Sequence, residues 1–183
     1  KLDPMMRYPY PNWTPIGGWR IDPSLVYAHS LQESAFRTSV ISGAGARGLM
    51  QVKPTTAQEM ARARGAFLSA NDLDRPSVNL EYGQSYIEKL RDMNATGGLL
   101  PKVIAAYNAG PGNVNKWLAR NGDPRSGGID ILDWIEQIPI FETRNYVQRV
   151  LENAVMYDHL NPDKARYRNN MPLSHYLGRR AVG

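Results

Sequence analysis

Cysteine is absent from the 183-residue sequence, which excludes disulfide bonds, a cysteine nucleophile and metal sites built on thiolates. Only three histidines occur, and their spacing matches no pattern of metal ligands. Phosphate-binding glycine motifs are missing too. We therefore expect neither a metal nor another cofactor. No stretch approaches the roughly 20 apolar residues that a membrane-spanning helix needs, so we expect no transmembrane segment.

A large excess of one charge is also missing from most of the chain. The sequence has 22 basic and 17 acidic residues, a net charge of +5. Residues 1–160 are nearly neutral, which argues against a nucleic-acid-binding surface. The excess lies in residues 161–183, with five basic residues and one acidic residue. This segment is either a solvated tail or a surface for an envelope or secretion partner of opposite charge.

The chain divides into three parts by composition. Residues 1–22 are rich in proline and aromatic residues, and we expect an extended arm without a helix that packs on the domain. Residues 23–160 form the domain itself. Residues 161–183 form the basic tail, in which Leu173, Tyr176 and Leu177 predict partial docking at most.

Apolar residues in the central part recur at three- and four-residue steps, which predicts a mainly α fold. The only strand signal is at 49–53, so we expect at most a very small β element. The predicted helices are 23–36, 55–64, 77–93, 101–109, a short helix after Pro111, 129–137 and 142–159.

The helix over 23–36 carries an acidic residue in its last turn. Asp22 is a suitable N-cap and Pro23 fits the first turn. Glu33 lies near the negative end of the helix dipole, which favours its neutral form if it is also shielded from water. A carboxyl group that stays neutral near pH 7 can act as a general acid. The alternative is a solvated surface glutamate.

Two further segments have compositions suited to a ligand site. In 45–51, glycines permit close approach of the backbone, Met50 offers an adaptable apolar wall, and Gln51 offers an amide for hydroxyl or acetamido groups. In 105–112, Tyr107 and Asn108 end a helix beside a Gly-Pro-Gly turn. Together with an acid, these groups indicate a carbohydrate site. Taken singly, they fit a core methionine, a core tyrosine and a helix-capping asparagine.

Four motifs in this order resemble the soluble lytic transglycosylase catalytic domain of the lysozyme-like superfamily, over residues 23–160. They are Glu33-Ser34, the segment from Ser42 to Gln51, Ala106-Tyr107-Asn108-Ala109-Gly110-Pro111-Gly112, and Ile138-Pro139 with Glu142-Thr143-Arg144 and Tyr146-Val147. The resemblance implies a lysozyme-like helical domain that acts on peptidoglycan glycan strands in the periplasm or elsewhere outside the cytoplasm.

The resemblance also implies a reaction and a set of site residues. The enzyme would cleave the β-1,4 bond between N-acetylmuramic acid and N-acetylglucosamine and leave a 1,6-anhydromuramic end. Glu33 would be the general acid and then the base. The resemblance assigns glycan contacts to Ser42, Met50, Gln51, Tyr107 and Asn108, and it places Glu142 and Tyr146 in the same cleft.

Two nearby residues remain open from the sequence. Glu142 lies at the start of the helix over 142–159, where the dipole favours the ionised form. It is either an auxiliary group in the cleft or a helix cap paired with Arg144. His29 lies one turn before Glu33 and can reach the same face, and we interpret it as a packing residue or local partner.

Other functions fit the same pattern. A muramidase that uses water would need the same acid, and a non-catalytic glycan-binding or assembly module would keep the cleft without it. Most glycosidases require a second carboxylate as nucleophile or base. Attack by the substrate's own 6-hydroxyl removes that requirement.

Overall fold

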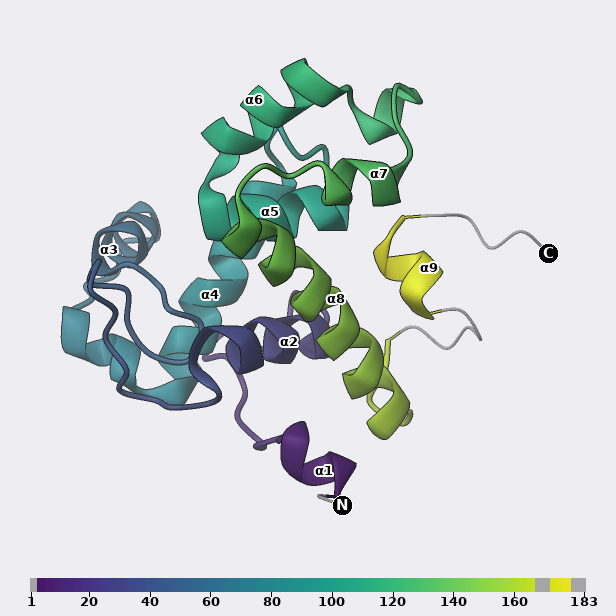
Figure 1. The fold of residues 1–183 in the computed structure, drawn as a ribbon. Coiled ribbons are helices and arrows are strands. Elements are labelled where there is room, and N and C mark those ends of the chain that lie inside the picture. Colours follow the sequence, from purple (N-terminus) through teal and green to yellow (C-terminus); the bar gives the residue numbers. More distant parts are fainter. Residues whose placement is uncertain (1–2, 167–171, 179–183) are drawn as a thin grey trace.

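The computed structural model describes residues 3–166 and 172–178. Helices dominate the described residues (Figure 1). They are α1 (Pro4–Arg7), α2 (Pro23–Ser34), α3 (Pro54–Ala63), α4 (Pro76–Arg91), α5 (Leu100–Ala109), α6 (Pro111–Asn121), α7 (Ile131–Glu136), α8 (Phe141–Leu160) and α9 (Pro172–Tyr176), with 3-10 turns at Ala70–Asp74 and Pro124–Ser126.

The packing of α2 against α8 forms the centre of the molecule, and α5 packs on α8 beside it (Figure 1). Nine of the twelve residues of α2 are buried, so this helix is enclosed rather than buried on one face. Val147, Val150 and Ala154 of α8 are fully buried against it. A fully buried valine or leucine contributes about 1.5–3 kcal/mol. This packing fixes α2, and with it the position of Glu33.

Proline marks the start of most of these helices. Pro23, Pro54, Pro76 and Pro111 each occupy the first position of a helix, where the missing N–H has no intrahelical partner to lose. Asp22 also accepts a hydrogen bond from the amide of Ser24, as a helix cap does. The predicted helices are all present, with ends displaced by a few residues.

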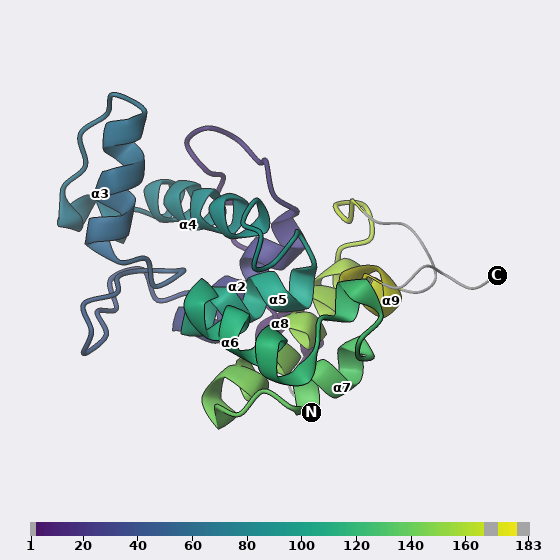
Figure 2. The same cartoon turned by 90° about the horizontal axis from the view of Figure 1, so that it is seen from above.

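The segment 35–53 between α2 and α3 is irregular, and the strand signal at 49–53 corresponds to no strand among the described residues. Only two isolated antiparallel bridges occur in it, Ile41 to Arg47 and Arg47 to Val52. The physical reason is the side chain of Asn79 on α4. It accepts from the amide of Met50, so this amide pairs with a side chain instead of with a neighbouring strand. The same side chain donates to the carbonyl of Arg47, which also accepts from the amide of Val52. Figure 2 shows this segment and α3 on one side of the molecule.

The N-terminal residues contain one helix that composition did not predict. Asp3 caps α1, and Pro4 takes its first position, so a single helical turn forms despite the proline content. Beyond it, the aromatic side chains contact the core. The hydroxyl of Tyr157 donates to the carbonyl of Pro9 at 2.7 Å, and that of Tyr27 donates to the carbonyl of Trp13 at 2.9 Å.

The C-terminal residues dock more firmly than predicted. Tyr176 and Leu177 are only 1% and 5% exposed, and α9 packs beside α8 (Figure 1). The reason is polar: the Tyr176 hydroxyl donates to Asp158 at 2.5 Å and lies 3.2 Å from Asp22. Three of the basic residues that define the predicted tail lie outside the described residues: Arg168, Arg179 and Arg180.

The division into arm, domain and tail remains a prediction. Within the described residues, no helix is long and apolar enough to cross a membrane.

Candidate active site

Glu33 lies in the last turn of α2, where the chain reverses sharply. Ala35 and Phe36 both have left-handed backbone angles, with φ of 49° and 61°. The hydroxyl of Ser34 donates to the carbonyl of Leu49 at 2.7 Å and so ties this turn to the segment 35–53. The end of α2 and the glycine-containing segment are therefore held together beside the glutamate.

The environment of Glu33 raises the pKa of its carboxyl group into the neutral range. Burial raises the pKa of its carboxyl group to about 7. The hydrogen bond that the Tyr146 hydroxyl donates to Oε1, at 2.9 Å, lowers this pKa, whereas the negative charge of Glu142 raises it. The carboxyl group can thus give up or accept a proton near pH 7, which general acid–base catalysis requires.

A cleft of about 600 Å³ opens in front of this carboxyl group. It contains six of the eight site residues predicted from the sequence: Glu33, Ser42, Gln51, Tyr107, Asn108 and Glu142. Its other lining residues are Ala44, Ala46, Val52, Lys53, Thr56, Tyr86, Ala109 and Gly110. The volume and the mixed polar and aromatic lining suit an oligosaccharide.

One wall of the cleft comes from the segment 35–53. Gln51 has a left-handed φ of 50°, and its amide nitrogen donates to the carbonyls of Val40 and Gly48. Both amide hydrogens are therefore used within the protein, which leaves the side-chain oxygen of Gln51 to accept from a ligand. Gly48 has φ of 73°, and a Cβ there would lie 2.4 Å from Nδ2 of Asn79, so only glycine fits.

The opposite wall comes from the end of α5. The Tyr107 hydroxyl donates to the carbonyl of Met50 at 2.7 Å, which fixes its ring in the cleft. Thr143 of α8 donates to Oδ1 of Asn108 at 2.7 Å. This orients the Asn108 side chain and leaves its amide hydrogens for a ligand.

Met50 does not form the apolar wall that the sequence indicated. Its side chain is fully buried, and a Cβ on Gly83 of α4 would lie only 2.1 Å from its sulfur. The absence of a side chain at Gly83 makes room for Met50 in the core. Met50 therefore contributes to the site through its carbonyl, which holds Tyr107.

Glu142 shares the cleft with Glu33. It is exposed in the first turn of α8, and its charge acts on the Glu33 carboxyl group. The alternative of a cap paired with Arg144 does not describe this helix end. Ile140 is the N-cap, and the Arg144 guanidinium lies over the ring of Phe141 at 5.6 Å.

Tyr146 and His29 lie behind Glu33, on the side away from the cleft. Tyr146 is 4% exposed and His29 is fully buried. Nδ1 of His29 lies 2.7 Å from the Tyr146 hydroxyl. Burial lowers the pKa of His29 to about 3, so the imidazole is neutral at physiological pH. Burial also holds the pKa of Tyr146 well above its ordinary range, so this hydroxyl stays protonated.

The transglycosylase SLT domain family matches residues 16–126, which is more than half of the chain. The chain belongs to this family. The chain is 36% identical over 149 residues to the soluble lytic murein transglycosylase of Escherichia coli K12, a match that covers 80% of this chain and 22% of that protein. It is 34% identical over 155 residues to the membrane-bound lytic murein transglycosylase C of Actinobacillus pleuropneumoniae serotype 5b. That match covers 76% of this chain and 42% of that protein.

Among solved structures, the 70 kDa soluble lytic transglycosylase of Escherichia coli resembles the SLT domain with a TM-score of 0.72 and 33% identity. The match covers 97% of this chain and 26% of that one. The family predicted from the motifs and the mainly α, lysozyme-like fold are thereby confirmed. The chain spans about a fifth of the length of the soluble lytic murein transglycosylase of Escherichia coli K12.

The sequence did not single out two residues that line the cleft, Lys53 and Tyr86. The spacing of Tyr86 along 77–93 indicated a core position. Its ring in fact lies 5.3 Å from that of Tyr107, between core and cleft. Lys53 follows the segment 45–51 closely, and this proximity is the signal that could have found it; Thr56, which also lines the cleft, comes three residues later.

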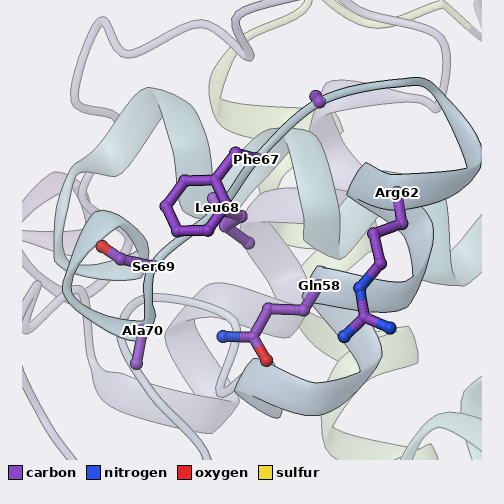
Figure 3. A pocket seen from close by; sticks show the side chains of 7 residues that line it. Gln58, Arg62, Phe67, Leu68, Ser69 and Ala70 are labelled. Carbon is purple, nitrogen blue, oxygen red and sulfur yellow. The ribbon is translucent and has the colours of Figure 1, made fainter.

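A second hollow of the SLT domain lies beside α3 (Figure 3). It measures about 380 Å³ and is lined by Gln58, Arg62, Leu68 and their neighbours, including Phe67, which is 92% exposed. No carboxylate is among these lining residues. Acid–base chemistry is therefore not available there, and the cleft at Glu33 is the candidate active site.

Proposed function

We propose that this SLT domain cleaves the β-1,4 bond between N-acetylmuramic acid and N-acetylglucosamine in peptidoglycan and leaves a 1,6-anhydromuramic end. The observation that carries the proposal is Glu33, a shielded carboxyl group with a pKa of about 7 at a cleft of oligosaccharide size. The SLT relatives named above are lytic murein transglycosylases, which supports the same reaction.

The first step is proton donation. Neutral Glu33 gives its proton to the glycosidic oxygen, and the bond to the anomeric carbon of the muramoyl ring breaks. The positive charge that develops on this ring is stabilised by the substrate's own acetamido oxygen. The Tyr146 hydroxyl, 2.9 Å from Glu33, stabilises the carboxylate that forms.

The second step returns the proton. Ionised Glu33 accepts the hydrogen of the 6-hydroxyl of the same muramoyl ring while its oxygen bonds to the anomeric carbon. The ring closes to the 1,6-anhydro product, and Glu33 is protonated again. One carboxyl group therefore completes the cycle, and no water is consumed.

The walls of the cleft bind the glycan in this scheme. Gln51 accepts a hydrogen bond through its free oxygen, and Asn108 donates through its amide group. Ser42 and the ring of Tyr107 supply further contacts. Glu142 binds a sugar hydroxyl or stabilises the developing charge from the mouth of the cleft.

Analysis of the products tests this function. Purified peptidoglycan digested with the wild type should release fragments with anhydromuramic ends by mass spectrometry. Glu33→Gln should lower turnover by about 100-fold or more, because one acid–base group contributes about 10²–10⁴ in rate. Glu152→Gln is a matched control, because Glu152 is an exposed carboxylate of α8 that pairs with Arg149.

Two results would contradict the proposal. Reducing muramic ends, heavier by one water, would identify a muramidase instead. Lysis that Glu33→Gln leaves unchanged would support a glycan-binding module without catalysis. Because the substrate lies in the cell wall, the proposal also places the protein in the periplasm or another compartment outside the cytoplasm.

A further inference from the structure

Three side chains form a hydrogen-bonded series that leads from the cleft into the core. The Tyr146 hydroxyl donates to Oε1 of Glu33 at 2.9 Å, and Nδ1 of His29 lies 2.7 Å from the same hydroxyl. His29 and Glu33 lie one turn apart on α2, and Tyr146 comes from α8, so the series crosses the central helix pair. His29 is fully buried and never meets the cleft.

The direction of these hydrogen bonds follows from counting hydrogens. A tyrosine hydroxyl has one hydrogen, and here it is donated to Glu33. The oxygen of Tyr146 must therefore accept from His29, which requires the hydrogen of the imidazole to be on Nδ1. A neutral imidazole has only one N–H, so Nε2 is left bare.

The surroundings of Nε2 agree with this arrangement. Nε2 is buried, and no described residue offers it a hydrogen-bond partner. Nε2 lacks a partner in either tautomer, and a buried N–H without an acceptor is tolerated less often than a bare acceptor. The other tautomer would also leave Nδ1 as an acceptor and draw the Tyr146 hydrogen away from Glu33.

We propose that His29 is a positioning residue that keeps its hydrogen on Nδ1 and thereby commits the Tyr146 hydroxyl to Oε1 of Glu33. The acidic proton of Glu33 is then confined to Oε2, which is the oxygen left for the substrate. This inference rests on the proposed function, because it specifies how Glu33 presents its proton to the glycosidic oxygen.

Neighbouring groups cannot replace His29 in this role. Tyr107 of α5 packs against the imidazole, with ring centroids 4.7 Å apart, but its hydrogen is donated to Met50. Tyr86 of α4 contacts Tyr107 on its other side. Glu142 acts on Glu33 through its charge and offers no hydrogen. Of these groups, only His29 donates to Tyr146.

NMR spectroscopy of the free protein tests the proposal without substrate. With ¹⁵N-labelled histidine, two-bond proton–nitrogen spectra distinguish the two tautomers. We expect His29 to show a protonated Nδ1 and a bare Nε2 from about pH 5 to about pH 8. His159→Gln and His175→Gln assign the other two signals. A protonated Nε2 on His29 would overturn the proposal even if the enzyme is a lytic transglycosylase.

Kinetics supply a second test. His29→Phe removes the donor to Tyr146, so the ionised form of Glu33 is less stabilised and its pKa rises. We expect kcat to fall about fivefold, the loss of one hydrogen bond, and the alkaline limb of kcat/KM to move to higher pH. His29→Asn keeps a donor near the position of Nδ1 and should restore the limb.

Tyr146→Phe and the double variant complete the design. Because His29 acts through Tyr146, the double variant should lose no more kcat than Tyr146→Phe alone. An alkaline limb that His29→Phe does not move, or losses that multiply in the double variant, would assign His29 to packing alone and refute the proposal.

Discussion

Burial, a hydroxyl group and a second carboxylate act on the carboxyl group of Glu33 in different directions. Burial raises its pKa, the Tyr146 hydroxyl lowers it, and the charge of Glu142 raises it again. The balance, a pKa of about 7, makes the residue both a usable acid and a usable base at neutral pH. The contributions of Tyr146 and Glu142 each belong to a single residue, so each of these two can be removed alone.

Glu142→Gln should lower the pKa of Glu33, because it removes a negative charge that disfavours the carboxylate. Protonated Glu33 is lost as the pH rises through its pKa, so the alkaline limb of kcat/KM should move to lower pH by a few tenths of a unit. This shift is opposite to the one expected for His29→Phe. It should shrink at high salt, because the cleft is open to solvent and ions screen the charge.

The pH profile of kcat/KM on peptidoglycan measures this effect, with Glu152→Gln of α8 as the control for a general loss of negative charge. A limb that stays in place would show that Glu142 does not act on Glu33 through its charge. A loss of turnover as large as that of Glu33→Gln would instead give Glu142 a direct part in the chemistry.

At the scale of elements, the positions of the helices could be predicted from the sequence more fully than the contacts of the site residues. Proline at the first position and apolar spacing define most helices locally, so their positions were predictable. The conformation of the segment 35–53 was not, because part of its backbone is held by Asn79, which lies on α4. Six of the eight residues that the motifs indicated line the cleft, whereas Met50 and Tyr146 are buried. The contact of His29 with Tyr146, 117 residues away, depends on how α2 and α8 cross.

Asn79→Ala should loosen the segment that carries Gln51. It leaves the amide of Met50 and the carbonyl of Leu73 without their partner, and the carbonyl of Arg47 keeps only the amide of Val52, in a region that is largely buried. We expect a loss of about 2–4 kcal/mol in the free energy of unfolding. Turnover should also fall, because the Met50 carbonyl that holds Tyr107 belongs to the same segment.

Urea unfolding and peptidoglycan turnover measure the two effects, and Asn94→Ala is the control, because Asn94 is an exposed asparagine just after α4. A stability equal to that of the control would show that the hydrogen bonds of Asn79 do not hold the segment.

At the scale of the whole molecule, residues near both ends of the chain are hydrogen-bonded to the α2 and α8 pair. The N-terminal residues receive hydrogen bonds from Tyr27 of α2 and Tyr157 of α8. Tyr176 from the C-terminal part binds Asp22, the cap of α2, and Asp158, near the end of α8. The pair that positions Glu33, Tyr146 and His29 is therefore supported from outside the segment 23–160.

Tyr176→Phe should destabilise the domain without altering the cleft. It removes the hydroxyl that donates to Asp158 and lies beside Asp22. The pKa of Asp22 is raised by burial and also by the negative charge of Asp158. We expect a loss of about 1–3 kcal/mol at pH 7. Asp22 has a raised pKa in the folded state, so its repulsion with Asp158 weakens as the pH falls through that pKa, and the loss of stability should become smaller in acid.

Thermal unfolding at several pH values measures this pH dependence, and Leu173→Ala is the control, because Leu173 is 49% exposed on α9. Equal stability of Tyr176→Phe and wild type at pH 7 would mean that the hydrogen bonds of the Tyr176 hydroxyl do not stabilise the domain.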